Sequence, residues 1–516
     1  MNKKFYITTP IFYANGDLHL GHAYALVLAD IIARYQRSIG KEVFFLTGSD
    51  EHGDKIIRAA QSNGVGPQLF VDNKAANMRG LISQLNISND GFIRTSDQKE
   101  HWLGAEKLWR ALEETGDIYK GTYKGLYCTG CEAFITEKDL VNEKCVYHDA
   151  IPETIEEENY FFKLSKYKTE LKDLLETGGI KITPQSKVRE MVALLDTVDD
   201  ISISRPARET KWGIPIPTST PHTRHSTLFQ LMYVWCDALS SYLSALGYGG
   251  NDEKNFNKFW PADLHVLGKE ILRFHVLILP AFLLSAKLPL PRQLLVHGFI
   301  NSGGKKMSKS IGNVLYPDDF ILEYGVDALR CYFAREAPPT EDWDLTHEKF
   351  KQVYNANLAH GLGNLVSRVL KMAEQYFGGQ VLGNEQLIIN SEQSGGQKKN
   401  IFDLIKDDIS PRYHLHMNAY EINKATDVIW ELIGNLDKFI TDHEPFTLIK
   451  TDKEATQKIL WSLLFGLREI AGMLVPIMPV TAEKILNFIQ VTDTIPNKDV
   501  IFSTKVLKEP LFKLKE

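Results

Sequence analysis

The stretch PIFYANGDLHLGH, residues 10–22, decides the fold of the N-terminal part of this 516-residue chain. The β-rich run at residues 5–11 predicts a strand that leaves a sheet through a polar turn and enters a helix. His19 and His22 lie three positions apart, so they share one face of that helix near its N-terminus. Unpaired backbone N–H groups and the helix dipole favour anionic oxygens there, and Gly21 leaves room for a ligand. The stretch therefore predicts a nucleotide phosphate site.

A second motif, KMSKS at residues 306–310, follows nearly three hundred residues later. Each motif alone is weak evidence for a catalytic site. Paired histidines near a helix end are commonly polar surface residues, and a Lys/Ser loop is commonly just solvated. Their joint occurrence in this order resembles the signature of class I aminoacyl-tRNA synthetases. The surrounding residues, up to about residue 480, resemble the methionyl-tRNA synthetase family.

Composition bounds the class of protein. The chain is 44% hydrophobic and 24% charged, which is ordinary for a globular protein of this length with about three domains. A net charge of −6 gives no whole-chain electrostatic argument for RNA binding, so RNA contact requires a local surface. No apolar run has signal-peptide length at the N-terminus, and the longest apolar stretches, 276–286 and 470–480, are too short to span a bilayer. We therefore expect a cytoplasmic protein without membrane contact.

Periodicity along the chain predicts the domain order. Strand and helix patterns alternate from residue 5 to about 115, which indicates right-handed βαβ units and a parallel sheet. The alternation breaks near Gly116, resumes in the second half, and gives way to helical periodicity from about residue 347. The segment 378–400, rich in Gly, Gln, Ser and Asn, predicts a loop.

With the resemblance, these patterns predict an α/β Rossmann-like catalytic domain with a zinc-binding connective insertion, followed by an all-α helix-bundle anticodon-binding domain. The expected boundaries are 1–115 and 223–300 for the two catalytic halves, 116–222 for the insertion, 301–346 for the KMSKS loop and linker, and 347–516 for the helical domain.

The metal prediction comes from the residues themselves. Cys128, Cys131, Cys145 and His148 form two ligand pairs at knuckle spacing, which is typical of tetrahedral zinc. Four protein ligands close the coordination sphere, so we expect one structural Zn²⁺ per chain. The resemblance is to the single-zinc-knuckle subtype, although its members often carry Cys at the position of His148.

The resemblance implies the chemistry of amino acid activation, in which a carboxylate attacks the α-phosphate of ATP and pyrophosphate leaves. His19 and His22 would stabilise the phosphates in the transition state, and Lys306 and Lys309 would close over the β- and γ-phosphates. Mg²⁺ would accompany ATP as its counter-ion. The implied ATP-binding residues are Gly21, Gly268, Glu270, Ile300, Lys306 and Lys309.

The resemblance also implies a methionine pocket. Asp50 would pair with the substrate ammonium group, and aromatic side chains suit a polarizable thioether. The implied methionine-binding residues are Ile11, Tyr13, Asp50, Trp235, Ala238, Tyr242, Ile271 and His275.

The helical region supplies the RNA hypothesis. Asn364 and Arg368 lie four apart on a predicted helix, and their side chains suit base-edge hydrogen bonds. The resemblance implies that both read the CAU anticodon and that Phe446, in the segment HEPF, stacks on an anticodon base. The implied partners are tRNA(Met), ATP and L-methionine. We expect a monomer, because no appended dimerisation domain is visible.

The predicted function is methionine–tRNA ligation. Two alternatives stay open: another class I synthetase, and a tRNA-binding paralogue that has lost catalysis. A third class is the small nucleotidyltransferases that share the motif HxGH, here HLGH at residues 19–22. Members of that class lack the KMSKS loop and the long helical region, both of which this sequence contains. A non-catalytic paralogue predicts a broken motif, whereas both motifs are intact here.

Overall fold

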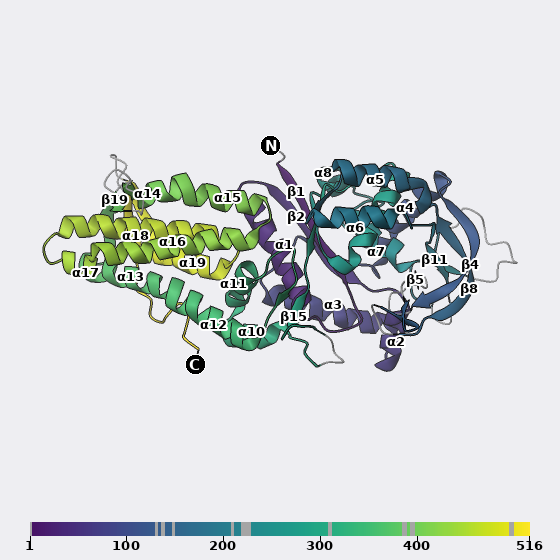
Figure 1. Ribbon diagram of the computed structural model, residues 1–516, viewed down its shortest axis with the longest axis horizontal. Coiled ribbons are helices and arrows are strands. Elements are labelled where there is room, and N and C mark those ends of the chain that lie inside the picture. Colours follow the sequence, from purple (N-terminus) through teal and green to yellow (C-terminus); the bar gives the residue numbers. More distant parts are fainter. Residues whose placement is uncertain are drawn as a thin grey trace. The chain divides into compact units, whose positions relative to one another are not determined.

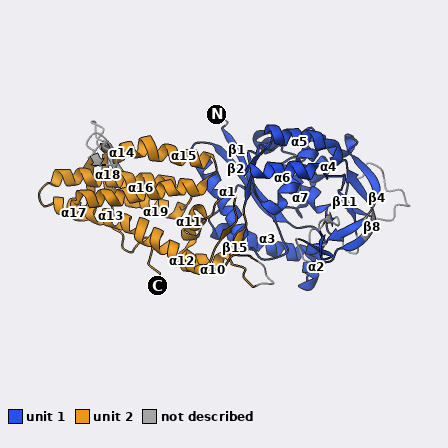
Figure 2. Cartoon of the chain, viewed as in Figure 1, with its two compact units in different colours: residues 1–297 blue, residues 298–516 orange. Residues whose placement is uncertain are grey.

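The computed structural model describes residues 3–128, 133–135, 140–146, 150–207, 211–217, 229–307, 312–383, 390–392, 398–494 and 500–515 (Figure 1). The chain divides into two compact units, residues 1–297 and 298–516 (Figure 2). The first unit contains the α/β sheet, and the second is predominantly helical.

Unit 1 is built on a six-stranded sheet whose neighbouring strands are all parallel. In spatial order the strands are β3 (Gly91–Arg94), β2 (Glu42–Asp50), β1 (Lys4–Tyr13), β13 (Leu264–Gly268), β14 (Gln293–His297) and β9 (Lys181–Thr183). Helix α1 (Leu20–Ser38) follows β1 and packs against the sheet. The predicted parallel Rossmann-like sheet is therefore confirmed.

The end of β1 is shaped by Pro10. The pairing of β1 with β2 is regular up to Thr8, shifts, and resumes at Ile11, because proline has no N–H to donate to the ladder. Beyond the irregularity, Tyr13 lies opposite Asp50 at the end of β2. Both carboxyl ends reach the edge of the sheet where ligands bind in open α/β folds.

The predicted insertion, residues 116–222, contributes strands to the main sheet and to several smaller sheets. Its long hairpin forms an antiparallel sheet of β10 (Ile201–Ser202), β8 (Glu153–Phe162), β4 (Ile118–Cys128) and β5 (Ala133–Ile135). Its strand β9 instead joins the edge of the main parallel sheet beside β14. Side chains of α5 (Lys168–Thr177) and α6 (Ser186–Leu195) pack into the same core as the catalytic strands.

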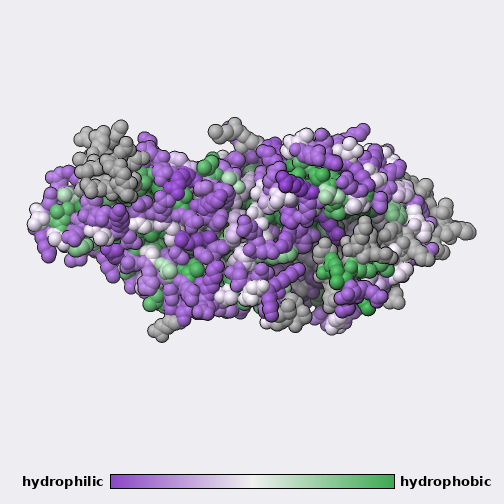
Figure 3. Space-filling view, viewed as in Figure 1, coloured by the Kyte–Doolittle hydropathy of each residue, from purple (hydrophilic) through white to green (hydrophobic). Residues whose placement is uncertain are grey.

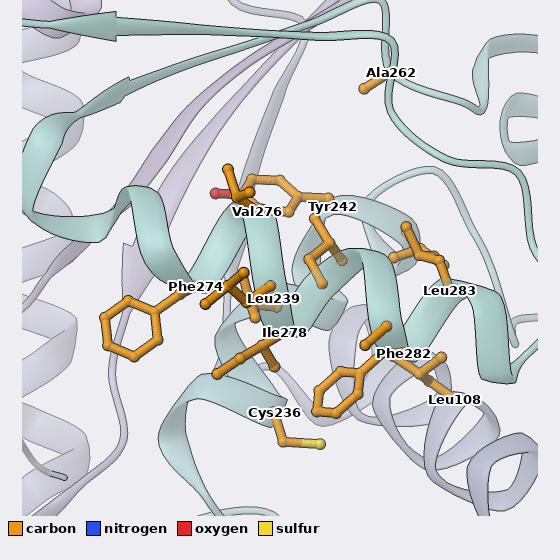
Figure 4. Close-up of a cluster of buried hydrophobic side chains, with 14 of the residues drawn as sticks. Leu108, Cys236, Leu239, Tyr242, Ala262, Phe274, Val276, Ile278, Phe282 and Leu283 are labelled. Carbon is orange, nitrogen blue, oxygen red and sulfur yellow. The ribbon is translucent and has the colours of Figure 1, made fainter. Parts of the chain in front are cut away.

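The core of unit 1 lies where four helical segments meet (Figure 4). They are α4 (Leu103–Glu114), α7 (Val234–Ser244), the π-helical η5 (Phe274–Ile278) and α9 (Leu279–Ser285). Leu239, Phe282 and Leu283 are almost completely inaccessible there. Helix α7 is buried on nearly every side, so its position is fixed by packing rather than by helix propensity.

Unit 2 is mainly helical, as predicted, and Figure 1 shows several of its long helices side by side. Its helices are α10 (Pro317–Tyr324), α11 (Val326–Glu336), α12 (His347–Val353), η6 (Tyr354–Gly363), α13 (Asn364–Phe377), α14 (Ile401–Leu404), η8 (Ile405–Ile409), α15 (Ser410–Asn418), α16 (Ile422–His443), α17 (Pro445–Leu448), α18 (Lys453–Leu474) and α19 (Pro479–Phe488). Four apolar side chains at helical spacing are buried in this unit: Leu358, Leu362, Leu365 and Val369.

Unit 2 also contains a three-stranded antiparallel sheet that the sequence did not predict. It consists of β18 (Gln380–Gly383), β22 (Val500–Thr504) and β21 (Ile489–Thr494). The prediction of a plain loop at 378–400 is wrong at its start, because β18 pairs with β22 from the other end of the unit. It is also wrong further on, because β19 (Asn390–Glu392) pairs with β20 (Lys398–Asn400). Trp461 of α18 contacts Phe502 of β22, which anchors this sheet on the helices.

In the part of the chain that the structure describes, no helix is both long enough and apolar enough to cross a membrane. The face of the molecule in Figure 3 is predominantly hydrophilic, with apolar side chains in small groups.

Candidate active site

The first turn of α1 is held by a reciprocal pair of hydrogen bonds between the two predicted catalytic histidines. His19 is the N-cap, and its Nδ1 accepts a hydrogen bond from the backbone N–H of Gly21 at 3.0 Å. Nδ1 of His22 accepts from the backbone N–H of His19 at 3.1 Å. The arrangement is a capping box built from imidazoles instead of the usual hydroxyl and carboxylate.

This capping pattern fixes the tautomer of both rings. Because each Nδ1 accepts a hydrogen bond, each ring carries its proton on Nε2. Burial, followed by the neighbouring His19, lowers the pKa of His22 to about 3, so its ring is neutral near pH 7. The side chain remains partly exposed. Two Nε2–H donors thus stand at a helix N-terminus, with ring centroids 4.0 Å apart.

Gly21 leaves room for the ring of His19. A Cβ at this position would lie 2.9 Å from Cε1 and 3.0 Å from Nδ1 of the His19 ring. The sequence predicted that Gly21 leaves room for a ligand. The structure adds that the folded-back imidazole of the N-cap occupies the space above this glycine.

Three predicted methionine-pocket residues lie at the carboxyl edge of the sheet. Ile11 and Tyr13 end β1, and Asp50 ends β2 opposite Tyr13. Asp50 is only 8% exposed. Burial, followed by the negative charge of Asp50, raises the pKa of Tyr242 above its ordinary range, which places that carboxylate within electrostatic reach of the tyrosine.

Tyr242 and His275 form a directed hydrogen bond in the floor of this region. Nδ1 of His275 lies 3.0 Å from the carbonyl oxygen of Ile271, and since a carbonyl only accepts, Nδ1 carries the proton. Nε2 therefore accepts from the Tyr242 hydroxyl at 2.7 Å. Burial lowers the pKa of His275 to about 4, which keeps the ring neutral.

The remaining predicted pocket residues are Trp235 and Ala238 on α7 and Ile271, which lies just before η5. Trp235, near the start of α7, stacks on Phe274 of η5 with ring centroids 3.6 Å apart and is partly exposed. Ala238 is buried one turn further along α7. Ile271 is partly exposed and packs against the core beside these aromatic rings.

Gly268 and Glu270 lie where β13 ends. Gly268 is the last residue of the strand, and Glu270 is exposed in the short helix η4 (Lys269–Ile271) that follows. A Cβ on Gly268 would lie 2.6 Å from Oε2 of Glu270, so the carboxylate folds back over the glycine. These two predicted ATP-binding residues are thus in direct contact at the carboxyl edge of the sheet.

A buried polar network that was not predicted as part of the site centres on Asp237. Asp237 of α7 accepts from Nδ1 of His52 at 2.7 Å and from Nε2 of His101 at 2.6 Å. A third buried histidine, His265 of β13, bonds Thr8 through Nδ1 at 2.7 Å, and its ring centroid lies 4.6 Å from that of Tyr242. For Asp237 and His265 the sequence signal was a charge or an imidazole inside an otherwise apolar run, whereas His52 and His101 stand in polar segments and carried no such signal.

The predicted phosphate-binding lysines belong to unit 2. Lys306 is exposed and lies in β16 (Lys305–Lys306), which pairs with β15 (Ile300–Ser302). Gly303 and Gly304 have positive φ and form the two-residue turn between these strands. Ile300 is 4% exposed and pairs with Trp343 in β17 (Trp343–Asp344). Lys309 lies outside the described residues.

The described part of the predicted zinc site contains two of its four ligands. Cys128 and Cys145 are each 1% exposed and belong to one small buried cluster with Ile135. Cys131 and His148 lie outside the described residues. In the described ranges no group of three or more potential metal ligands occurs, so the zinc stays a prediction.

The predicted anticodon residues lie on two elements of unit 2. Asn364, the first residue of α13, is exposed. Arg368, one turn later, donates from Nη1 to Asp437 of α16 at 3.1 Å. Phe446 in α17 is 49% exposed. Arg368 is therefore held in an ion pair that the sequence did not predict.

Comparison with known proteins gives consistent matches along the whole chain. A family model described as tRNA synthetases class I (M) matches residues 5–139 and 135–370, and one described as the anticodon binding domain of methionyl tRNA ligase matches residues 389–510. A methionine–tRNA ligase of Thermotoga maritima is 40% identical over 526 residues, which cover 99% of this chain and 80% of that protein. A methionine–tRNA ligase of Clostridium acetobutylicum is 40% identical over 487 residues, which cover 94% and 73%.

Solved structures agree with the sequence matches. Mycobacterium tuberculosis methionyl-tRNA synthetase in complex with methionyl-adenylate is similar to this chain with a TM-score of 0.88 and 33% identity, covering 99% of each chain. The apo form of the same synthetase gives a TM-score of 0.82 at 30% identity, covering 100% of this chain and 99% of that one.

Proposed function

Because this chain belongs to the methionine-specific family of class I tRNA synthetases, we propose that it is a methionine–tRNA ligase. It activates L-methionine with ATP to methionyl-adenylate, releases diphosphate, and transfers the methionyl group to the 3′ end of tRNA(Met). The observation that carries this proposal is the pair of Nε2–H donors of His19 and His22 at the N-terminus of α1. His19 ends the segment that connects β1, which ends opposite Asp50, to α1, and His22 lies in the first turn of α1.

In the activation step, an oxygen of the methionine carboxylate bonds to the α-phosphorus of ATP. The bond from that phosphorus to the bridging oxygen breaks, and diphosphate leaves with its electron pair. Charge accumulates on the phosphate oxygens, so neutral imidazoles that donate from Nε2 stabilise the transition state without a proton transfer. The capping hydrogen bonds hold both rings in place before the substrate arrives, which lowers the reorganisation cost.

The pocket beside this donor pair suits methionine. The Asp50 carboxylate binds the substrate ammonium, and the rings of Trp235 and Tyr242 contact the thioether side chain. The Tyr242 hydroxyl donates to His275, which leaves a tyrosine oxygen lone pair as an acceptor for the ligand. Ile11, Tyr13, Ala238 and Ile271 supply the apolar wall.

The rest of the nucleotide site follows the family pattern. Gly268 and Glu270 bind the ribose, because a carboxylate accepts hydrogen bonds from hydroxyl groups. Ile300 contacts adenine, Lys306 and Lys309 bind the outer phosphates, and Mg²⁺ accompanies ATP. Lys306 is exposed, so its ammonium group is accessible to a ligand, which supports this role.

Zinc in this proposal is structural. Cys128, Cys131, Cys145 and His148 hold one Zn²⁺ in the insertion, and the two buried thiols of one small cluster support this donor set. The metal organises the insertion and takes no part in activation.

Recognition of the tRNA is assigned to the helical unit. Asn364 and Arg368 bind anticodon base edges, and Phe446 stacks on a base; the exposure of Asn364 and Phe446 supports these roles. A monomeric ligase stays a prediction.

Aminoacylation of methionine-acceptor tRNA with radiolabelled methionine tests the proposal. The wild-type chain is expected to charge this tRNA, and Asp50→Asn, which keeps the shape but removes the charge, is expected to lose at least tenfold in kcat/KM for methionine. Asp54→Asn, at the start of α2 (Asp54–Ser62), is the matched control and retains activity. A wild-type protein that charges no methionine contradicts the proposal.

A further inference from the structure

We propose that Asp237 is a positioning residue for the amino-acid pocket. It ties the segment that carries Asp50 to the helix that carries Trp235, Ala238 and Tyr242. The inference rests on the proposed function, because it concerns how that pocket holds methionine.

The carboxylate of Asp237 joins three elements of unit 1. Its Oδ2 accepts from Nδ1 of His52, two residues beyond Asp50, and its Oδ1 accepts from Nε2 of His101 in η1 (Gln98–Trp102). Nδ1 of His101 in turn lies 2.8 Å from Oγ of Ser244, near the end of α7. The chain of hydrogen bonds therefore begins beside Asp50 and ends on α7.

Burial makes this network costly to break. Asp237, His52 and His101 are 1%, 3% and 0% exposed, so no bulk water replaces a lost partner. Burial raises the pKa of Asp237, but the charge and hydrogen bonds of His52 and His101 outweigh it and hold the pKa below its usual value. The carboxylate is thus ionised at neutral pH, and each imidazole donates to a charged acceptor, which is the stronger kind of hydrogen bond.

The segment around Asp50 is fixed on its other side by a separate set of contacts. Glu51 bonds Ser49 and Ser96, accepts from Nε of Arg94 at 2.8 Å, and its backbone N–H donates to Thr95. These contacts orient Glu51 toward β3. The bond from His52 to Asp237 joins the same segment to α7, so the pocket residues of β2 and α7 keep a defined separation.

The alternative is that the network only stabilises the core. If the role is purely structural, loss of the network lowers the stability of the protein and changes the KM values for methionine and ATP equally. A positioning role affects methionine selectively, because Asp50, Trp235 and Tyr242 contact methionine, whereas ATP binds at the N-terminus of α1 and the end of β13.

The test measures methionine-dependent ATP–diphosphate exchange of the full chain, with separate KM values for methionine and ATP. Asp237→Ala and His52→Ala are expected to raise the KM for methionine by roughly tenfold or more and the KM for ATP by less than about twofold. Asp237→Asn, which retains an acceptor and the side-chain volume, is expected to restore part of the loss.

Asp117→Asn is the matched control, because Asp117 is also buried and bonds Lys166, Tyr167 and Ser285 away from the predicted pocket. It is expected to leave the ratio of the two KM values unchanged. Equal changes in both KM values for Asp237→Ala, or an unchanged KM for methionine, would overturn the positioning role.

A second readout does not depend on activity. Hydrogen–deuterium exchange of peptides covering residues 47–57 is expected to accelerate in Asp237→Ala and not in Asp117→Asn. If the wild-type chain shows no methionine-dependent ATP–diphosphate exchange, the proposed function fails. The deuterium measurement alone then decides whether Asp237 holds this segment. Unchanged deuterium uptake in Asp237→Ala would contradict the inference.

Discussion

Nδ1 of His22 accepts a hydrogen bond from the backbone N–H of His19 at 3.1 Å, while the His19 ring caps the same helix through Gly21. Each histidine therefore uses Nδ1 for the fold and carries its ring proton on Nε2. This division explains why imidazole suits both positions: a hydroxyl or carboxylate can cap the helix but offers no N–H donor to a phosphate.

Gly21→Ala tests this arrangement. The new methyl group would lie 2.9 Å from Cε1 of His19, so the imidazole must move. We expect methionine-dependent exchange to fall at least tenfold, while thermal stability stays within about 1 kcal/mol of wild type, because alanine favours the helix. Gly80→Ala in α3 (Pro67–Gln84), where a Cβ meets nothing within 4 Å, is the control and keeps full activity. Full activity of Gly21→Ala would show that the His19 position is unimportant.

Acid is expected to destabilise unit 1 through two buried imidazoles. Burial lowers the pKa of His265 to about 3 and that of His275 to about 4, against an ordinary value of 6.5. Below pH 6.5 these two imidazoles bind protons in the unfolded chain but stay neutral in the folded chain. The free energy of unfolding therefore decreases as the pH is lowered, by up to about 1.4 kcal/mol per pH unit for each ring. Urea unfolding of His275→Gln at pH 7 and pH 5 is expected to show a smaller loss than wild type. Equal losses would contradict neutral burial of this ring.

Much of the catalytic region was predictable because its signals are local. The strand, turn and helix around residues 10–22 lie in one continuous stretch, and α1 begins at Leu20, beside the histidines that the pattern places near its N-terminus. The pairs that the sequence did not predict join distant residues. Asp237 meets partners 185 and 136 positions away, and Arg368 meets Asp437 across 69 positions.

Short strands were the other limit of prediction. β9 has three residues and β18 has four, so neither carries enough alternation to be recognised. Their partners, β14 and β22, are separated from them by more than one hundred residues. Only the tertiary pairing makes these segments strands.

Arg368→Ala is expected to impair tRNA charging without affecting activation. Loss of a base-edge contact raises the KM for tRNA by roughly tenfold to a hundredfold, while ATP–diphosphate exchange, which needs no tRNA, stays unchanged. Asp437→Asn separates the two contributions, because it breaks the ion pair but keeps the guanidinium. If Asp437→Asn raises the KM for tRNA as much as Arg368→Ala does, the role of Arg368 is to hold the helices through its ion pair. Direct contact of Arg368 with the RNA would then be contradicted.

Metal content tests the zinc site directly. The purified protein is expected to contain one zinc per chain by elemental analysis, and Cys128→Ser and Cys145→Ser to lose it, because a hydroxyl is a poor zinc ligand. Cys331→Ser, at a buried thiol of α11 in the other unit, is the control and retains the metal. A wild-type protein without zinc would remove the metal from the proposal.

The most direct test of the central claim is amino-acid-dependent ATP–diphosphate exchange, measured with each of the twenty amino acids on the purified chain. Exchange with methionine alone is the predicted result, because it requires both the phosphate donors of α1 and the pocket around Asp50. Exchange with a different amino acid would contradict the assigned pocket, and no exchange with any amino acid would contradict the ligase function.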